Sequence, residues 1–454
     1  MAPEAERLTT RQFQTAPGTE DWRGLGRGAH AWFAARSHAD GAALLRTVVA
    51  ACAERGTVLP DLDLRSTGLR VRLAATGEGF TWETVEAARA TSAAARDLGL
   101  TAQPEAVQEV QLALDTHNPV TAITFWETAL GHVRQGDEDV VDPARRHLPV
   151  WFQGMDAPRP LRSRFHLDSV AARAVAVATV DRLEAEGARV ERHGYYATVS
   201  DPEGNEVDVL PLPEGEDLWT ETGTEDWRLV FAAVAAYPVP SHGQLLDLAT
   251  GVADLADAAG LPLGIDVRPL PTRRADTQHG QDDRGGAADG RAVVTLHTAK
   301  DGWEMDDGYP ALAAQVQRLA RSLELTADPD LARFVQVGLD AADIPGVRAF
   351  WQAALGYDPD PRPDVTDIVD PRGLGPVLFF QPIDELDEQR RAQRNRHHID
   401  VFLPHDVAAA RVEAAVAAGG TVVRDAAPFW WTLADPEGNE IDLAVTVGRD
   451  EEWG

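Results

Sequence analysis

Two hexamers occur twice in this chain of 454 residues. DPEGNE stands at 201–206 and again at 435–440, and GTEDWR stands at 18–23 and again at 223–228. Each copy of DPEGNE combines an Asp-Pro with a Gly-Asn and runs into an alternating polar and apolar segment, which is typical of a turn followed by a strand. Two exact repeats in different segments indicate that the whole chain is a tandem duplication.

Longer segments support this interpretation. Residues 98–115 match 323–340 at an offset of 225 residues, and 162–168 match 394–400 at an offset of 232 residues. Small changes in offset are expected when loops differ in length between two copies. The sequence therefore predicts the order A-B-A′-B′, with boundaries at 8–103, 107–214, 220–328 and 331–448.

The insertion at 271–290 lies in A′ and is polar and rich in glycine, so it cannot bury a core and is predicted to be a mobile loop. The surfaces of duplicated units remain nearly self-complementary, so A is expected to pair with A′ as subunits pair in a homodimer. The two oligomeric states left open are a monomer with an internal pseudo-two-fold axis and a homodimer.

The composition limits the kinds of partner that the protein is expected to bind. The formal net charge is −31, from 73 acidic and 42 basic residues, and this field repels nucleic acid and anionic membranes. It favours cationic ligands, but an acidic surface that only keeps the protein soluble accounts for it as well. The chain has one cysteine, no apolar run of membrane-spanning length and no signal-like N-terminus, so we expect a cytoplasmic protein.

The sequence predicts that unit B consists of a strand, a helix and further strands, and that this order occurs twice within the unit. On its strands one face is apolar and is expected to lie under the helices, and the opposite face is polar. The same alternation holds in B′. The polar positions are Gln111, Gln153, His166 and Asp208 in B, and Gln336, Gln381, His398 and Asp442 in B′.

These residues, with RFHLD at 164–168 and the two DPEGNE turns, resemble the vicinal oxygen chelate superfamily, which includes glyoxalase I, extradiol dioxygenases and bleomycin-resistance proteins. The resemblance is greatest to its bacterial glyoxalase-like branch and covers 107–213 and 332–447. It implies an α+β fold in which two βαβββ modules close a cup-shaped sheet. It also implies a divalent metal ion (Zn, Ni, Mn or Fe) bound by Gln111, Gln153, His166 and Asp208, and by Gln336, Gln381, His398 and Asp442.

By the same resemblance, His166, Asp208, His398 and Asp442 are the candidate catalytic residues. Arg164, Asp168, Trp151, Arg396 and Asp400 are the candidate substrate contacts. We expect the side-chain ends of Gln111, His166 and Asp208 to lie a few ångströms apart, and those of Gln336, His398 and Asp442 likewise. Two amides, one imidazole and one carboxylate are a weak set for hard divalent ions, so a metal-free polar cup that binds an organic ligand is the alternative.

Unit A resembles pterin-4a-carbinolamine dehydratase, a small antiparallel sheet with helices on one side. The family signature His-His-Pro-Asp is replaced here by Val-Leu-Pro-Asp at 58–61, and the following Thr-His pair is replaced by Ala75-Thr76. In A′, His297 falls about two residues short of the catalytic position. Valine and leucine transfer no protons, so A and A′ are expected to be degenerate modules that serve in packing.

Three functions remain open from the sequence. The first is a glyoxalase-like enzyme of the lyase, isomerase or oxygenase class, in which an aspartate or histidine of the cup moves a proton. The second is a non-catalytic protein that sequesters a small molecule, as antibiotic-resistance proteins do. The third, a pterin dehydratase, is disfavoured by the missing histidines.

Overall fold

The computed structural model describes residues 7–75, 79–270, 290–384 and 386–453. The predicted loop at 271–290 lies, except for Gly290, outside the described residues, as does Thr76. The fold is mixed α and β, with one nine-stranded sheet, two eight-stranded sheets and a two-stranded ribbon of β1 (Arg7–Leu8) and β6 (Phe80–Thr81). None of the described helices is long and apolar enough to cross a membrane.

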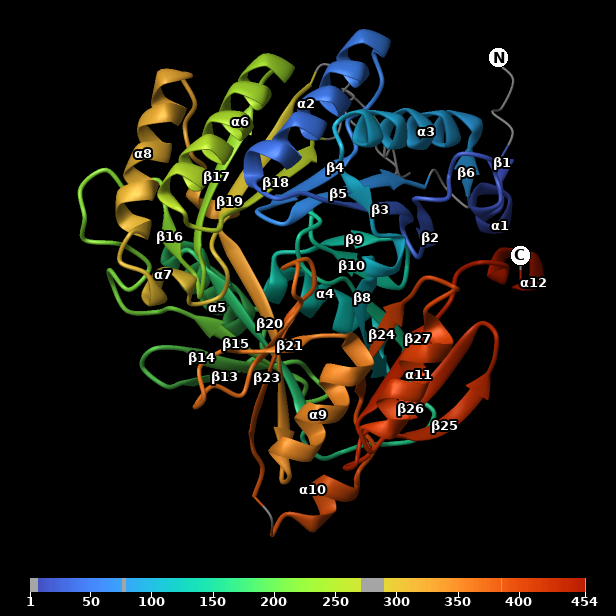
Figure 1. The fold of residues 1–454 in the computed structure, drawn as a ribbon. Helices are drawn as coiled ribbons and strands as arrows, with labels where there is room; N and C mark the ends of the chain where they lie inside the picture. The colour runs from blue at the N-terminus through green and yellow to red at the C-terminus, as the bar shows by residue number, and fades with distance from the viewer. Residues whose placement is uncertain (1–6, 76–78, 271–289, 385, 454) are drawn as a thin grey trace.

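The nine-stranded sheet forms the upper layer in Figure 1 and joins the A and A′ regions. Its central pair is β4 (Asp61–Arg65) of A and β18 (Gly264–Pro269) of A′, which run antiparallel with Asp63 opposite Asp266. The expected contact between A and A′ is therefore present. The remaining strands are β2 (Arg23–Leu25), β3 (Gly28–Ala34), β5 (Gly68–Ala74), β7 (Thr101–Ala102), β16 (Arg228–Leu229), β17 (Ala233–Val239) and β19 (Ala292–His297).

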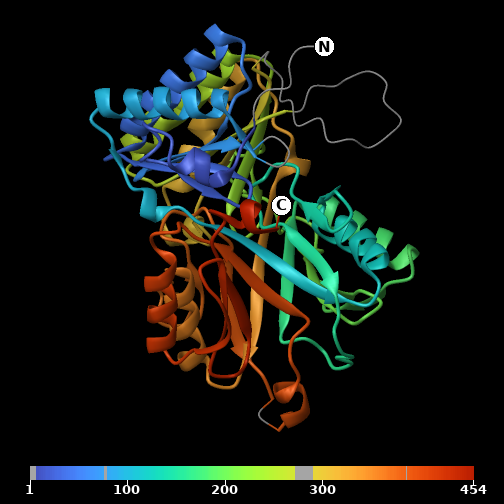
Figure 2. The ribbon, with the colours of Figure 1, turned by 90° about the vertical axis from the view of Figure 1, so that its right-hand side faces the viewer.

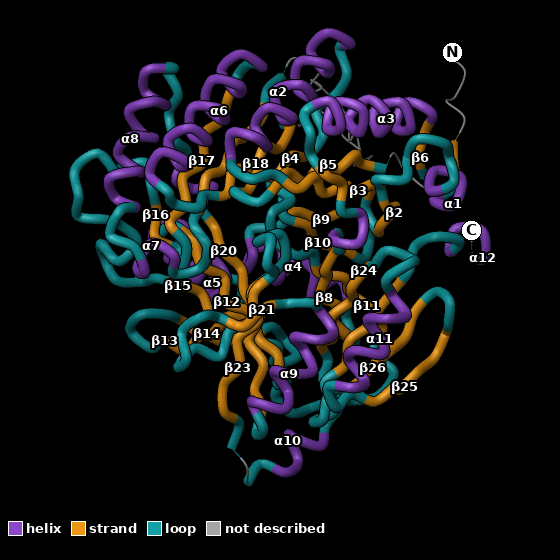
Figure 3. Tube along the Cα trace, viewed as in Figure 1, coloured by secondary structure: helices purple, strands orange, loops and turns teal. Residues whose placement is uncertain are grey.

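Helices cover one face of this sheet, seen as the purple layer at the top of Figure 3. The central two, α2 (His38–Arg55) and α6 (His242–Ala259), pack against each other and begin and end alike. Ser37 and Ser241 accept hydrogen bonds from the first turns, and Gly56 and Gly260 end the helices in the left-handed conformation. The flanking helices are α3 (Trp82–Asp97) and α8 (Tyr309–Ser322), and short helices elsewhere are α1 (Thr10–Gln14), α7 (Gly302–Met305), α10 (Glu388–Ala392) and α12 (Arg449–Trp453).

Each eight-stranded sheet takes half of its strands from B and half from B′. The first sheet joins the early strands of B to the late strands of B′ through antiparallel pairing of β8 (Glu109–Thr116) with β24 (His397–Phe402). We call this sheet cup I. Its other strands are β9 (Val133–Gln135), β10 (Asp139–Val141), β11 (Val150–Gly154), β25 (Thr421–Ala426), β26 (Trp430–Ala434) and β27 (Glu440–Ala444).

The second sheet, cup II, joins the late strands of B to the early strands of B′. Here β12 (Phe165–Ala171) pairs antiparallel with β20 (Arg333–Ala341). The sequence predicts one cup within B and another within B′. This part of the prediction is wrong, because each cup combines strands of both units. The other strands are β13 (Arg189–Arg192), β14 (Ala197–Ser200), β15 (Glu206–Leu210), β21 (Asp358–Pro359), β22 (Ile368–Val369) and β23 (Val377–Pro382).

The helices of B and B′ lie on the outer flanks of the cups (Figure 2). In B, α4 (Pro119–Leu130) packs against α5 (Arg173–Ala185), and in B′, α9 (Ile344–Leu355) packs against α11 (Ala408–Ala417). Both α4 and α9 have proline near the N-terminus and end at a left-handed glycine. One apolar core runs beneath both cups, so the two sheets are parts of one packed body.

Candidate functional site

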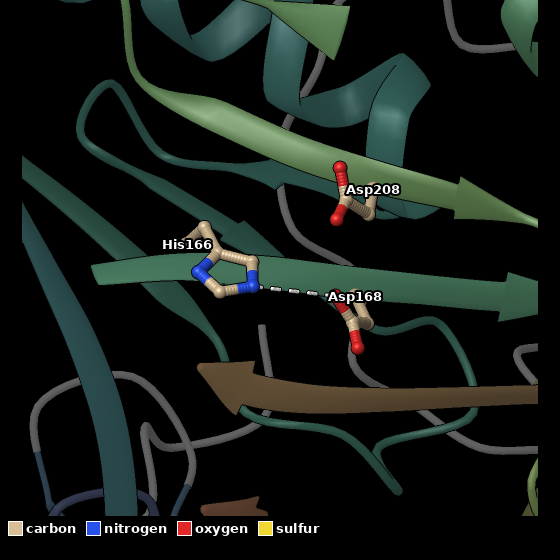
Figure 4. A group of neighbouring side chains, drawn as sticks. All are labelled: His166, Asp168 and Asp208. Atoms are coloured by element: carbon tan, nitrogen blue, oxygen red, sulfur yellow. Dashed lines mark ion pairs between the residues drawn. The ribbon is translucent and has the colours of Figure 1, made fainter. Parts of the chain in front are cut away.

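Each cup holds one histidine and two aspartates close together. In cup II these are His166, Asp168 and Asp208, and one potential ligand atom from each lies within 4.8 Å of the others (Figure 4). In cup I the equivalent residues are His398, Asp400 and Asp442. The two clusters are therefore equivalent in composition and in the strands that carry them.

Strand geometry explains why these side chains converge. Along β12 the buried Phe165 and Leu167 face the core, so His166 and Asp168 face the opposite side. The parallel strand β15 places Asp208 directly beside Asp168. The strand alternation predicted for these positions is therefore confirmed.

The glutamine of each cluster comes from the other copy of unit B. Gln336 lies opposite Asp168 and donates from Nε2 to Asp168 Oδ2 at 2.7 Å, and Gln111 donates in the same way to Asp400 Oδ2 at 2.9 Å. The expectation that Gln111 lies with His166 and Asp208 is wrong, because β8 pairs with β24 instead of β12. For the same reason Gln336 lies in cup II and not with His398 and Asp442.

Burial and neighbouring charged groups shift the pKa values of residues in both clusters. The pKa of Asp168 is raised to about 6, mainly by burial and in smaller part by the charge of Asp208. Burial, followed by the charge of Asp400, also raises the pKa of Asp442. Burial lowers the pKa of His398, but its hydrogen bond with Asp400 and the nearby carboxylates outweigh that effect and raise it overall. Asp208 itself accepts a hydrogen bond from Thr198 at 2.6 Å.

Gln153 and Gln381 bind neighbouring acids. Gln153 donates to Asp115 and Gln381 donates to Asp340, each at 2.6 Å. Asp115 is also paired with Arg159, and Asp340 with Arg390. Gln153 therefore lies in cup I and Gln381 in cup II, so the predicted grouping of Gln153 with His166, and of Gln381 with His398, is wrong for the same reason as for Gln111 and Gln336. Whether either glutamine binds a metal ion stays a prediction.

Arg164 and Arg396 hold the repeated turns and do not point into a cup. Arg164 donates to the carbonyl oxygen of Glu437 at 2.7 Å, and Arg396 donates to the side chain of Asn205 at 2.6 Å. Both are almost fully buried, and each bonds the turn of the other copy. Their predicted substrate contacts are therefore replaced by a structural role. Trp151 alternates onto the cup face and donates to Glu138 at 3.4 Å.

Cup II also receives a cation that sequence reasoning missed. Lys300 forms an ion pair with Asp367, and its Nζ lies 5.6 Å from the ring centre of Phe231 and 5.9 Å from that of Phe379. The rings of Phe379 and His166 are nearly perpendicular, and their centres lie 5.4 Å apart. Lys300 belongs to A′, and no local motif indicates that its loop reaches the cup.

The positions that resemble the dehydratase site hold a buried leucine and a paired histidine. Leu59 is buried, and His297 Nε2 lies 3.2 Å from Asp266 while its Nδ1 lies 3.1 Å from the carbonyl oxygen of Thr298. Burial lowers the pKa of His297. That A and A′ lack dehydratase machinery stays a prediction.

Comparison with known proteins gives one match in unit B and one in unit B′. The family model described as a glyoxalase-like domain matches residues 111–210 and 336–444. No curated protein matches the chain significantly. Two segments of the chain, one in unit B and one in unit B′, are therefore similar to a glyoxalase-like domain.

Solved structures of that kind are similar to the chain at low identity. A mutant of glyoxalase I from Zea mays is 11% identical, with a TM-score of 0.36, over 76% of this chain and 95% of that one. A putative dioxygenase from Bacillus subtilis is 11% identical, with a TM-score of 0.34, over 75% of this chain and 86% of that one. A glyoxalase-related enzyme from Fulvimarina pelagi is 22% identical, with a TM-score of 0.18, over 24% and 84%.

Proposed function

We propose that the chain is a glyoxalase-like enzyme that acts on a small molecule in each cup, with a divalent metal ion held by the histidine and two aspartates. The observation that carries the proposal is the pair of clusters, each with its three ligand atoms within 4.8 Å, inside a cup built from strands. The reaction belongs to the lyase, isomerase or oxygenase class.

The residues present fit a divalent ion. In cup II, Gln336 Oε1 is buried without a hydrogen-bond partner among the described residues, and in cup I the same is true of Asp442 Oδ1. Buried carboxylate and amide oxygens without donors are costly unless a cation meets them. The second aspartate of each cup, which the sequence prediction had assigned to substrate, strengthens the donor set with an anionic oxygen.

The chain's own residues supply proton transfer and orientation. Asp168 and Asp208 lie side by side, so one can remain charged and hold the ion while the other holds or moves a proton. Thr198 fixes Asp208, and Gln336 fixes Asp168. When bound, the ion would act as a Lewis acid toward a carbonyl or enediol oxygen.

We propose further that A-B-A′-B′ arose by duplication and that A and A′ are degenerate dehydratase-like modules that act as a scaffold. The matching order of strands and helices in A and A′, and the antiparallel pairing of β4 with β18, support this.

Metal analysis combined with turnover assays tests the proposed activity. The full-length protein should bind about two divalent ions per chain and should turn over members of a panel of carbonyl and vicinal diol compounds. The variants Asp168→Asn and Asp400→Asn should each remove one ion. A protein that binds panel compounds without metal and without turnover would instead be the sequestering protein, and the proposed activity would be wrong.

A further inference from the structure

The face of the nine-stranded sheet that is turned away from its helices is charged and buried. Along β4, Leu62 and Leu64 face the helices, so Asp61, Asp63 and Arg65 face the cups. Arg70 and Arg72 of β5, with Asp266 and Arg268 of β18, lie on the same side. A cavity of ≈ 100 Å³ lies between this face and units B and B′.

Arginine outnumbers acid around this cavity. Four carboxylates line it, and Asp61 lies beside it in ion pairs with Arg72 and Arg145. Seven arginines line it, two of them from the loop after β10, against these five acids and the buried Asp142, which pairs with His147 of the cavity wall, so positive charge is in excess in a chain whose formal net charge is −31. The seven are Arg27, Arg65, Arg70, Arg72, Arg145, Arg146 and Arg268.

The histidines do not change this balance. His297 lines the cavity, and burial lowers its pKa, so it is neutral at pH 7. The neighbouring His30 is fully buried beside Glu109 and has its pKa lowered by burial as well. The uncompensated charge is therefore guanidinium charge, which does not titrate in this range.

Several of these guanidinium donors have no acceptor within the described parts of the chain. Arg268 is 2% exposed, and its Nε has no hydrogen-bond partner among the described residues. Arg70 donates from Nε to Asp63 at 2.7 Å, and its two terminal nitrogens donate no hydrogen bond to any residue that the structure describes. Buried guanidinium groups without full pairing are costly in a medium of low dielectric constant.

We propose that this cavity binds one small inorganic oxyanion of the phosphate or sulfate type. Arg70 and Arg268 bind it, and Arg27 and Arg146 complete the surrounding positive field. The size of the cavity admits a single tetrahedral anion and excludes a nucleotide. A planar guanidinium suits such an anion, because two N–H groups can meet two oxygens of one ligand. This proposal does not rest on the proposed enzymatic activity.

The bound anion would link three regions of the molecule. Arg70 belongs to A, Arg268 to A′ and Arg146 to B, and the segment 370–377 of B′ closes the cavity. An anion that contacts all of these binds the folded arrangement and not the unfolded chain, so it should stabilise the protein by mass action.

The test uses the full chain and inorganic phosphate. The protein is dialysed against anion-free buffer, denatured and assayed for released phosphate and sulfate, and the folded protein is titrated with phosphate by calorimetry. We expect about one oxyanion per chain, either released or bound, and a thermal midpoint that rises saturably with phosphate but not with sodium chloride at equal ionic strength. A cavity filled only by water would give no released anion, no heat and no such rise, and would overturn the proposal.

Variants localise the site. Arg268→Gln should weaken phosphate binding roughly tenfold or more, because one charged donor is lost. Arg70→Gln, at the cavity wall, provides a second variant if the first does not fold. Arg36→Gln is the matched control, because the Arg36 side chain is 92% exposed and pairs, among the described residues, only with Asp40. Equal phosphate affinity in Arg70→Gln and Arg36→Gln would place the bound anion elsewhere and overturn the assignment.

Discussion

Gln111 donates a hydrogen bond from Nε2 to Asp400 Oδ2 at 2.9 Å, although 289 residues separate them. The register of β8 and β24 places these two residues directly opposite each other. The same bond recurs between Gln336 and Asp168 in the other cup. Each cup is thus completed only when both copies of unit B are present, so the two halves of the chain are interdependent.

A half-length chain should consequently form a dimer. Residues 1–218 contain β8 and β12 but lack their partners β24 and β20, which leaves two strand edges unpaired. Because β12 corresponds to β24, β8 of one half-chain can pair with β12 of another. Sedimentation equilibrium should give twice the half-chain mass. A stable, well-folded monomer would contradict this account of the sheets.

The terminal aspartates of the two clusters should control activity. Asn keeps the shape of Asp208 but removes its charge, so Asp208→Asn should lower turnover in cup II by roughly 10²-fold or more if the residue is a positioned base or ligand. The double change Asp208→Asn with Asp442→Asn should abolish the activity that one intact cup would otherwise mask. Steady-state turnover is the measurement, and Asp137→Asn, on the exposed surface, is the control. Unchanged turnover in the folded double variant would make both residues structural.

The aspartate that opens each repeated turn should matter for stability. Asp201 is 5% exposed and accepts hydrogen bonds from the backbone of Glu203 and Asn205 and from the indole of Trp126. Asp201→Ala leaves these buried donors unpaired and should lower the free energy of unfolding by about 3 kcal/mol. Urea unfolding measures this change. Glu214→Ala, at an exposed position, should change it by less than about 0.5 kcal/mol, and equal effects would contradict the role of the turn.

The charged layer beneath the nine-stranded sheet should make stability fall in acid. Burial alone would raise the pKa of Asp61, but Arg72 and Arg145 hold it well below its usual range. A carboxyl group with a lowered pKa in the folded state stabilises the fold above its unfolded value near pH 4, and that contribution is lost as the pH falls further. Unfolding free energies measured between pH 7 and pH 3 should therefore decrease below about pH 4. Constant stability over that range would contradict the prediction.

Much of the site was accessible from the sequence. The period of two along a strand fixes which residues share a face, so His166, Asp168 and Asp208 could be assigned to one polar surface without a structure. The alternation also places Asp168 and Asp400 on that surface, but the resemblance assigns them to substrate, because its ligand set does not include them. Lys300 was missed, since it reaches cup II from a loop of A′.

The sequence by itself determined the repeated order of strands, helices and turns and the face on which each polar side chain lies, because these follow from local periodicity. Only the tertiary structure decided which strands meet. The segments that contain β12 and β24, RFHLD and RHHID, are nearly alike, so β8 has no local preference between them. The choice depends on contacts between distant regions, among them the pairing of β4 with β18, and no short segment encodes such contacts.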